Sequence, residues 1–91
     1  MTAVRIPPTL RAEVGGERQV EADGDTVREV LEDIVGRYPA LGAQIFSNGD
    51  IATFVNVYLG GEDVRTLDGL DTAVGTQTVI LLPAMAGGSR P

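Results

Sequence analysis

The end of the chain holds a Gly-Gly pair, Gly87-Gly88, whose position permits a particular kind of chemistry. Glycine has no Cβ, so a backbone of small residues can enter a narrow channel and approach a reactive centre closely. A terminal glycine also presents an unhindered acyl carbon. The pair follows the short spacer Ala84-Met85-Ala86, so we expect it to be held out on a tail. Such a tail is suited to carrying an acyl group into another protein's active site.

Two further Gly-Gly pairs, at residues 15–16 and 60–61, lie between stretches that look like strands, and there we interpret them as turns. The pair at 87–88 is different because it lies beyond the last predicted strand. Three residues, Ser89-Arg90-Pro91, follow it. While they are attached, Gly88 carries an amide and has no free carboxylate.

The composition argues against an enzyme. The chain has 91 residues, no cysteine and no histidine, so disulfides, cysteine-based zinc sites and the commonest general base are all missing. We therefore expect no bound metal or cofactor. The length suits one domain, which we place at residues 1–83, with a tail at 84–91.

The net charge of −6 favours a basic protein partner or simply solubility, and it argues against nucleic acid and anionic membranes. No stretch approaches the length of a transmembrane helix, and the N-terminus lacks the layout of a signal peptide. The expected location is cytoplasmic.

The strongest local signal is a helix that begins after Thr26. Thr26 and Glu29 have the spacing of a capping box, and Pro39 is expected to end the helix near Tyr38. One apolar stripe recurs at helical spacing: Val27, Val30, Leu31, Ile34, Val35 and Tyr38. A short second helix is predicted at 41–46, closed by residues 47–49, and a turn or single helical turn at 68–72.

The remaining apolar stretches predict strands, at residues 2–7, 17–22, 54–59, 62–65 and 78–82. The first two are expected to form a hairpin, and proline at 7–8 ends the first. The predicted fold class is α+β, a β-grasp (ubiquitin-like) fold. It has a mixed four- to five-stranded sheet packed on one main helix, and a flexible C-terminal tail.

Two of the strands are apolar on both faces. Strict alternation puts Val55, Val57 and Leu59 on one side, together with Val79 and Leu81. The other side has no second long helix to cover it. We therefore predict an exposed apolar partner-binding patch made of Phe54, Tyr58, Ile80 and Leu82. The alternatives are that segment 41–46 folds over this face, or that the two faces are reversed.

Several stretches resemble the ThiS/MoaD family of sulfur carriers: residues 54–58 (FVNVY), 60–65 (GGEDVR) and 82–88 (LPAMAGG). Residues 6–11 (IPPTLR), 15–16 and 24–26 (GDT) are most similar to the CysO branch of actinobacteria, which supplies sulfur for cysteine synthesis. The resemblance spans residues 1–88. The terminal motif is specific for the carrier class and less so for the pathway.

The resemblance implies that the chain is a carrier on which partner enzymes act. An E1-like adenylating and sulfurtransferase enzyme would use ATP and Mg²⁺ to activate the Gly88 carboxylate, and a sulfur donor would then leave a thiocarboxylate there. The acceptor would be an aminoacrylate on a PLP-dependent cysteine synthase. Gly87 and Gly88 are the expected reacting end, and Pro83, Ala84, Met85 and Ala86 would line the partner's channel.

The resemblance also implies a processing step, because family members that work directly end at the second glycine. A JAMM-type zinc peptidase would cleave between Gly88 and Ser89. The alternative is that residues 89–91 are a cloning scar.

Other functions remain open. Within sulfur transfer, the acceptor could belong to a sulfur-containing secondary metabolite pathway, or the chain could be a molybdopterin synthase small subunit. A second class is a ubiquitin-like modifier joined through Gly88 to lysines of target proteins. A third is a plain binding module without tail chemistry. Glu62, Asp63 and Asp68 could meet a basic partner, although a solvated surface is the simpler interpretation.

Overall fold

The first turn of the main helix is fixed by the predicted cap. In the computed structural model, which describes residues 1–53 and 55–83, helix α1 spans Val27–Arg37. The Glu29 N–H donates to the Thr26 hydroxyl over 3.2 Å, and the Asp25 N–H donates to the Glu29 carboxylate over 2.8 Å. The Glu29 carboxylate therefore accepts from the N–H of Asp25, the residue before the cap, and not from the N–H of Thr26. This is a small variation on the capping box.

The apolar stripe of α1 faces the core, as predicted. Four of its side chains are buried, and Val35 and Tyr38 are half-buried against the same cluster. The helix ends at Arg37, with Tyr38 as its cap and Pro39 directly after it. Burial of this stripe supplies much of the hydrophobic stabilisation of the helix, since a short helix is marginal alone in water.

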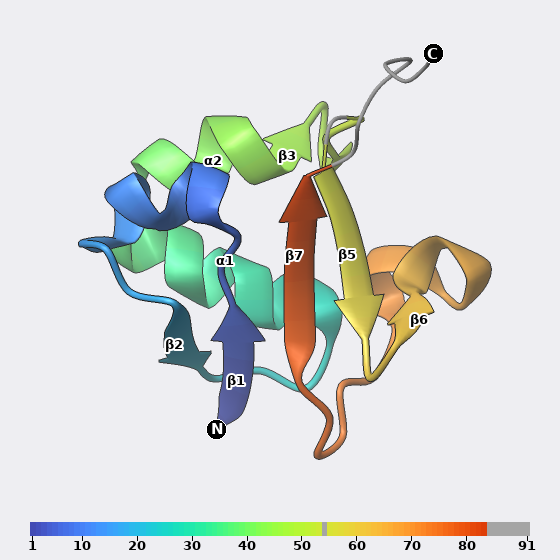
Figure 1. Ribbon diagram of the computed structural model, residues 1–91. Coiled ribbons are helices and arrows are strands. Elements are labelled where there is room, and N and C mark those ends of the chain that lie inside the picture. The colour runs from blue at the N-terminus through green and yellow to red at the C-terminus, as the bar shows by residue number, and fades with distance from the viewer. Residues whose placement is uncertain (54, 84–91) are drawn as a thin grey trace, which may run out of the picture.

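The sheet contains five strands in the order β2-β1-β7-β5-β6 (Figure 1). Their bounds are β1 Thr2–Arg5, β2 Gln19–Ala22, β5 Val55–Leu59, β6 Glu62–Asp63 and β7 Val79–Pro83. β1 and β7 run parallel, whereas the other neighbouring pairs are antiparallel. This is the mixed sheet of a β-grasp fold, and it confirms the predicted fold class.

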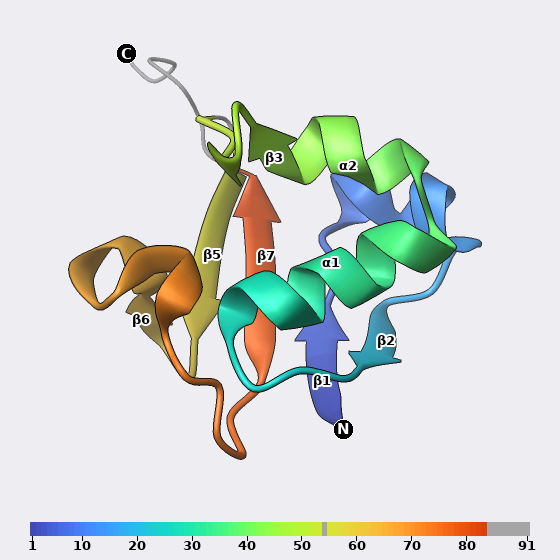
Figure 2. The same ribbon diagram turned by 180° about the vertical axis from the view of Figure 1, so that it is seen from behind.

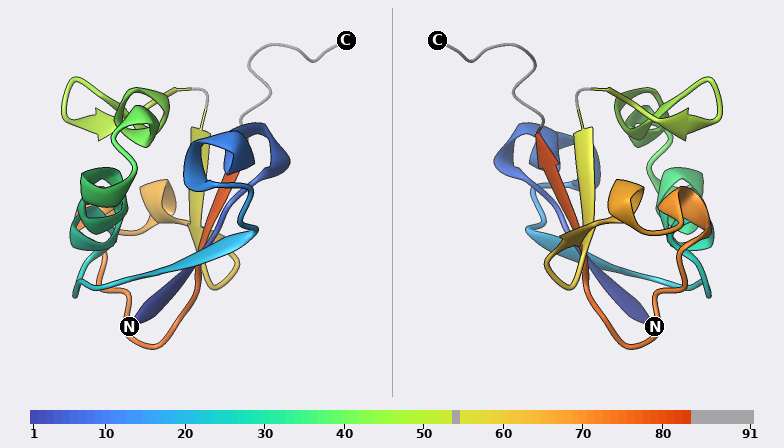
Figure 3. Two further views of the ribbon diagram at one scale, coloured as in Figure 1. Left: turned by 90° about the vertical axis from the view of Figure 1, so that its left-hand side faces the viewer. Right: turned by 90° about the vertical axis from the view of Figure 1, so that its right-hand side faces the viewer.

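The helices cover one face of this sheet. α1 and the short helix α2 (Ala40–Ile45) both lie on that side (Figures 2 and 3). Gly42 of α2 approaches α1 so closely that an added Cβ would lie 3.3 Å from the Val35 side chain. Leu41 and Ile45 of α2 are buried in the same core as α1. The alternative in which this segment folds over the other face of the sheet is therefore wrong.

The turn predicted at residues 15–16 is present. Residues 8–14, directly before it, have no helix or strand predicted from the sequence. They form a 3₁₀ helix, η1 (Pro8–Val14), so the first strand ends at Arg5 and not at residue 7. Pro8 suits the first helical turn because its φ is preset and it has no N–H to satisfy. Burial of Leu10 and Val14 anchors the segment to the core, and Gly15 ends it at φ 70°. The predicted hairpin is thus a β1–β2 pair with a helical connection.

Two other segments also differ from the prediction. Residues 46–51 form a small hairpin of β3 (Phe46–Ser47) and β4 (Asp50–Ile51), where only a helix end was expected. Its turn has φ 53° at Asn48 and φ 81° at Gly49, the positive values that favour an Asn-Gly hairpin turn. The strand predicted at 62–65 is only β6, followed by the 3₁₀ helix η2 (Val64–Thr66). The predicted helical turn near residue 70 is confirmed as η3 (Gly69–Asp71).

The cap of α1 allows a direct test. Thr26→Ala should lower the free energy of unfolding by about 1 kcal/mol, because the Glu29 N–H loses its acceptor. Thr76→Ala, an exposed position in a turn, is the control and should change it by less than about 0.5 kcal/mol. Urea denaturation followed by circular dichroism would measure both. Equal losses in the two variants would contradict the capping role.

Candidate functional site

The residues predicted to carry the chemistry lie outside the described part of the chain. These are Gly87 and Gly88, with the neighbouring positions Ala84, Met85, Ala86 and Ser89, and Phe54 of the predicted patch. The division into a domain at 1–83 and a tail at 84–91 therefore stays a prediction. The structure does place Pro83, the residue before the predicted tail, at the end of β7.

The base of the tail is held from both sides. β7 is the middle strand of the sheet, flanked by parallel β1 and antiparallel β5. In the final rungs Leu82 pairs with Asn56 and Pro83 pairs with Val55. Pro83 has no N–H to donate, a feature that sheets tolerate at strand ends. Pro83, which directly precedes the predicted tail, is therefore held at one end of the central strand.

The two faces of β5 and β7 are those predicted. Val55, Val57 and Leu59 are buried, together with Val79 and Leu81. On the opposite face Tyr58 and Ile80 are cross-strand partners and both are half-buried, and Leu82 is 41% exposed. The structure therefore places three of the four predicted patch residues on one open face. Their role in partner binding stays a prediction.

Arg65 lies near this face, and no separate role was predicted for it from the sequence. Its Nη1 donates to the Asn56 side chain over 2.9 Å, and its Nη2 donates to the carbonyl oxygens of Val55 and Ala52 over 2.9 and 3.3 Å. The guanidinium thus ties η2 to the start of β5, on both sides of residue 54. No local sequence pattern announces such a contact, because its partners are nine to thirteen positions away.

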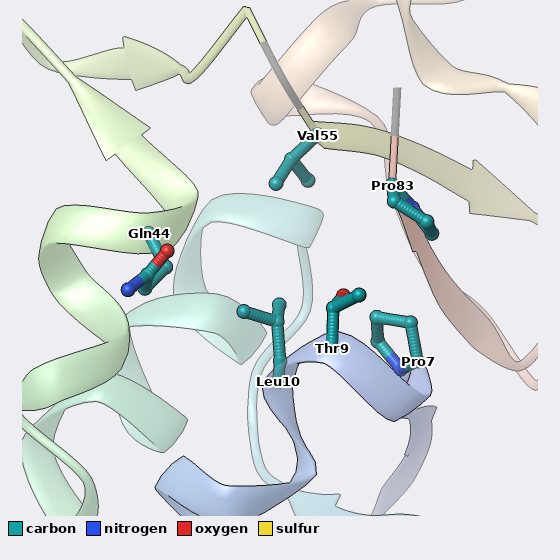
Figure 4. Close-up of a pocket in the computed structure, with 6 residues that line it drawn as sticks. All are labelled: Pro7, Thr9, Leu10, Gln44, Val55 and Pro83. Carbon is teal, nitrogen blue, oxygen red and sulfur yellow. The ribbon is translucent and has the colours of Figure 1, made fainter. Parts of the chain in front are cut away.

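Two hollows meet at Pro83. One is a cavity of about 200 Å³ between η1, α2 and the ends of β5 and β7 (Figure 4). It is lined by Pro7, Thr9, Leu10, Gln44, Val55 and Pro83. The other is a groove of about 330 Å³ between the β1–η1 segment and β7, and Pro83 lines it too. The sequence predicts neither hollow, because Pro7-Pro8 indicates only the end of a strand.

The acidic residues singled out from the sequence do not form one site. Asp63 uses its carboxylate within the chain, where it accepts the Arg65 N–H over 2.9 Å and lies 4.0 Å from the Arg65 guanidinium. Glu62 and Asp68 are exposed, in keeping with a solvated surface. In residues 1–53 and 55–83, no group of three or more His, Cys, Asp or Glu side chains is placed to hold a metal ion.

The helices of the described segments are too short, or too polar, to cross a membrane. The candidate features in the described chain are the open face of the sheet, the two hollows and the end of β7 at Pro83. None of these brings together a nucleophile, a general base and an anion-binding group. All of them lie around β7, the strand that precedes the predicted tail.

Comparison with known proteins agrees with this picture. The sequence model described as the ThiS family matches residues 4–88. The chain is 40% identical over 89 residues to the sulfur carrier protein CysO of Mycobacterium tuberculosis, covering 93% of this chain and 96% of the relative. It is also 38% identical over 81 residues to small archaeal modifier protein 1 of Haloferax volcanii, covering 85% of this chain and 90% of that protein.

The fold comparison points the same way. The crystal structure of the Amycolatopsis orientalis BexX/CysO complex contains a chain that superposes with a TM-score of 0.89 at 40% identity. The match covers 97% of this chain and all of the other. The family match spans nearly the whole chain, and its C-terminal limit is Gly88, the second glycine of the tail motif. This chain therefore belongs to the ThiS family.

Proposed function

We propose that this protein is a sulfur carrier whose reactive group is a thiocarboxylate on Gly88. The observation that carries the proposal is the family match, which runs from residue 4 to Gly88 and stops there. The 40% identity to a protein named as a sulfur carrier supports the same role. The described residues provide a docking face and a fixed exit for the tail. The chemistry is supplied by partner enzymes, so the chain is a cosubstrate and not a catalyst.

The first step is removal of Ser89-Arg90-Pro91. Hydrolysis of the Gly88–Ser89 amide consumes one water and leaves a carboxylate on Gly88 and an amine on Ser89. A JAMM-type zinc peptidase is the proposed partner. The family match supports this step, because it excludes the three residues that follow Gly88.

The second step activates the carboxylate. A Gly88 oxygen attacks the α-phosphate of ATP on an E1-like enzyme with Mg²⁺, and pyrophosphate leaves. A hydrosulfide ion, the chemical class of donor in this scheme, then attacks the acyl carbon and displaces AMP, so the C–O bond to AMP breaks as a C–S bond forms and the S–H proton is lost to water. The product is a thiocarboxylate, which is an anionic sulfur nucleophile at neutral pH, as a thiolate of low pKa is.

The proposed acceptor is an aminoacrylate on a PLP-dependent cysteine synthase. The thiocarboxylate sulfur attacks the electrophilic carbon of the aminoacrylate, and later hydrolysis of the thioester restores the Gly88 carboxylate. The similarity to CysO supports cysteine synthesis as the first choice. Supply of sulfur to another metabolite, or to a molybdopterin synthase, uses the same tail and differs only in the acceptor.

A second candidate function is protein modification. The observation that favours it is the 38% identity to small archaeal modifier protein 1. In that case the activated Gly88 acyl group would pass to a lysine amine of a target protein and form an amide. Covalent conjugates of this chain with target proteins, of raised mass and resistant to thiol treatment, would indicate protein modification. A carrier with a thiocarboxylate on Gly88 would form no such conjugates.

The first test is the intact mass of the protein recovered from its own host under sulfur-demanding growth. We expect the loss of residues 89–91 and the replacement of one oxygen by sulfur, because the proposed carrier ends in a thiocarboxylate on Gly88. An unprocessed and unmodified mass would contradict the proposal and favour a binding module.

The second test uses the extension. A chain that lacks Ser89–Pro91 should be adenylated by the host's E1-like enzyme without a peptidase, whereas the full-length chain should not, because its Gly88 has no free carboxylate. ATP–pyrophosphate exchange measures the reaction. Gly88→Ala in the shortened chain is a control for the fit of the terminus to the active site. Exchange with the uncleaved full-length chain would exclude the processing step.

The third test addresses the open face. Leu82→Asp should weaken binding to the activating enzyme by about tenfold or more, because a charge would enter the apolar contact. Leu67, between η2 and η3, is 42% exposed against 41% for Leu82, so Leu67→Asp is a matched control that we expect to bind normally. Calorimetric titration measures both, and thermal melting checks that both fold. Normal binding by folded Leu82→Asp and Ile80→Asp variants would rule out the patch.

A further inference from the structure

The groove beside β7 differs in charge from the molecule as a whole. The net charge is −6, yet the nine residues that line the groove are two arginines and seven apolar residues, with no carboxylate among them. The arginines are Arg5, at the end of β1, and Arg11, in η1. A basic and apolar groove on an acidic protein indicates a local binding preference that the total charge conceals.

The two arginines are also unlike most others in the described structure. Arg28 pairs with Asp71 at 3.4 Å, Arg37 pairs with Asp33 at 3.3 Å, and Arg65 lies 4.0 Å from Asp63. Within residues 1–53 and 55–83, by contrast, no carboxylate forms an ion pair with Arg5 or Arg11. A guanidinium binds a carboxylate through two parallel N–H donors, so an unneutralised pair of arginines suits an external carboxylate.

The local geometry holds these charges beside the apolar patch. Arg5 is aligned with Ile80 in the parallel β1–β7 pair, and Ile80 in turn is aligned with Tyr58. Arg11 donates from Nε to the Ile6 carbonyl over 3.0 Å, which fixes its stem and leaves its two terminal nitrogens for other acceptors. Arg5 is exposed and Arg11 is half-buried. The positive charges therefore border the exposed part of the patch at Ile80 and Leu82.

The short reach of the predicted tail favours a partner that contacts this end of the sheet. Pro83 lines the groove and is the residue from which the tail departs. Five residues, 84–88, lie between it and the end of Gly88, and five extended residues span about 17 Å. That reach is less than the shortest extent of the molecule, 24 Å. We therefore expect an enzyme that acts on Gly88 to contact the end of β7, where the groove lies.

We infer that the groove binds a segment of the E1-like activating enzyme in which an apolar side chain is flanked by carboxylates. The apolar residue would contact Ile80 and Leu82, and the carboxylates would pair with Arg5 and Arg11. The inference rests on the proposed function for the identity of the partner. A protein segment fits better than a free anion, because seven of nine lining residues are apolar and gain nothing from an inorganic ion. Nucleic acid is disfavoured by the net charge of −6.

The test compares two charge reversals in the chain shortened to Gly88. Arg5→Glu should raise KM for the activating enzyme by about tenfold with kcat nearly unchanged, because docking is weakened while the reacting end is intact. Arg28→Glu, on α1, makes the same change in net charge and should leave KM within about twofold of the original value. ATP–pyrophosphate exchange gives both constants, and thermal melting confirms that each variant folds.

Salt supplies a readout that a folding defect would not produce. Raising NaCl from about 0.05 M to about 0.5 M should weaken binding of the original chain and strengthen that of Arg5→Glu, since screening removes attraction in one and repulsion in the other. Arg11→Glu should behave like Arg5→Glu. An unchanged KM in both variants, or the same salt response in all chains, would overturn the inference.

Failure of the inference can be told from failure of the proposed function. If the original shortened chain shows no exchange but binds the enzyme, and Arg5→Glu abolishes binding, the groove assignment stands and adenylation of Gly88 is refuted. If the original chain does not bind the enzyme at all, both are refuted. Saturable amide shifts around Arg5 and Arg11 on addition of millimolar inorganic phosphate would identify a free-anion site and overturn the protein-segment assignment.

Discussion

The hydrogen bonding of β7 on both of its edges is the interaction on which the rest of the molecule depends. β7 joins the β1–β2 pair to the β5–β6 pair, and without it the sheet would be two separate hairpin-like units. Its inward side chains, Val79 and Leu81, are 0% and 1% exposed within the common core. Central strands of this kind are expected to open only with global unfolding. The base of the tail is therefore attached to the most strongly held part of the domain.

A second constraint is that helices cover only one face of the sheet. The strands β5 and β7 are apolar on both sides, so one apolar set is buried under α1 and the other is left at the surface. In the described chain, η1 borders the second set and lines a groove with Ile80 and Leu82, but it leaves Leu82 41% exposed. Partial exposure of Leu82 and Ile80 is thus a consequence of the architecture. It gives a partner apolar surface close to the exit of the tail.

The distribution of charge follows from the same two-sided arrangement. The polar side of α1 carries carboxylates and arginines that neutralise one another, as Arg37 and Asp33 do. The groove beside β7 receives Arg5 and Arg11 without a carboxylate among its lining residues. A total charge of −6 therefore says little about the surface nearest to the reactive end. The register of β1 against β7 decides which charges lie beside the patch, and this register exists only in the folded sheet.

Local sequence patterns are sufficient to predict the main helix, the class of fold and the two faces of β5 and β7. These depend on local periodicity, on the cap at Thr26 and on strict alternation, all of which act over a few neighbouring residues. The Gly-Gly motif and the resemblance to a carrier family are likewise recognisable from the sequence. Asn48-Gly49, which forms the turn between β3 and β4, is also visible in the sequence, but there it predicted the end of a helix and not a hairpin.

Contacts between residues that are distant in the sequence depend on the folded sheet and are not predicted by any local pattern. The 3₁₀ helix at 8–14 forms because Leu10 and Val14 find a core supplied by other elements. The contacts of Arg65 with the start of β5 have no signature in the local pattern. The groove of Arg5, Arg11 and Leu82 joins residues more than seventy positions apart through the parallel β1–β7 pair. Helix and strand preferences act between neighbouring residues and can be predicted from the sequence. A binding surface such as this groove forms only after strands that are distant in the sequence have paired.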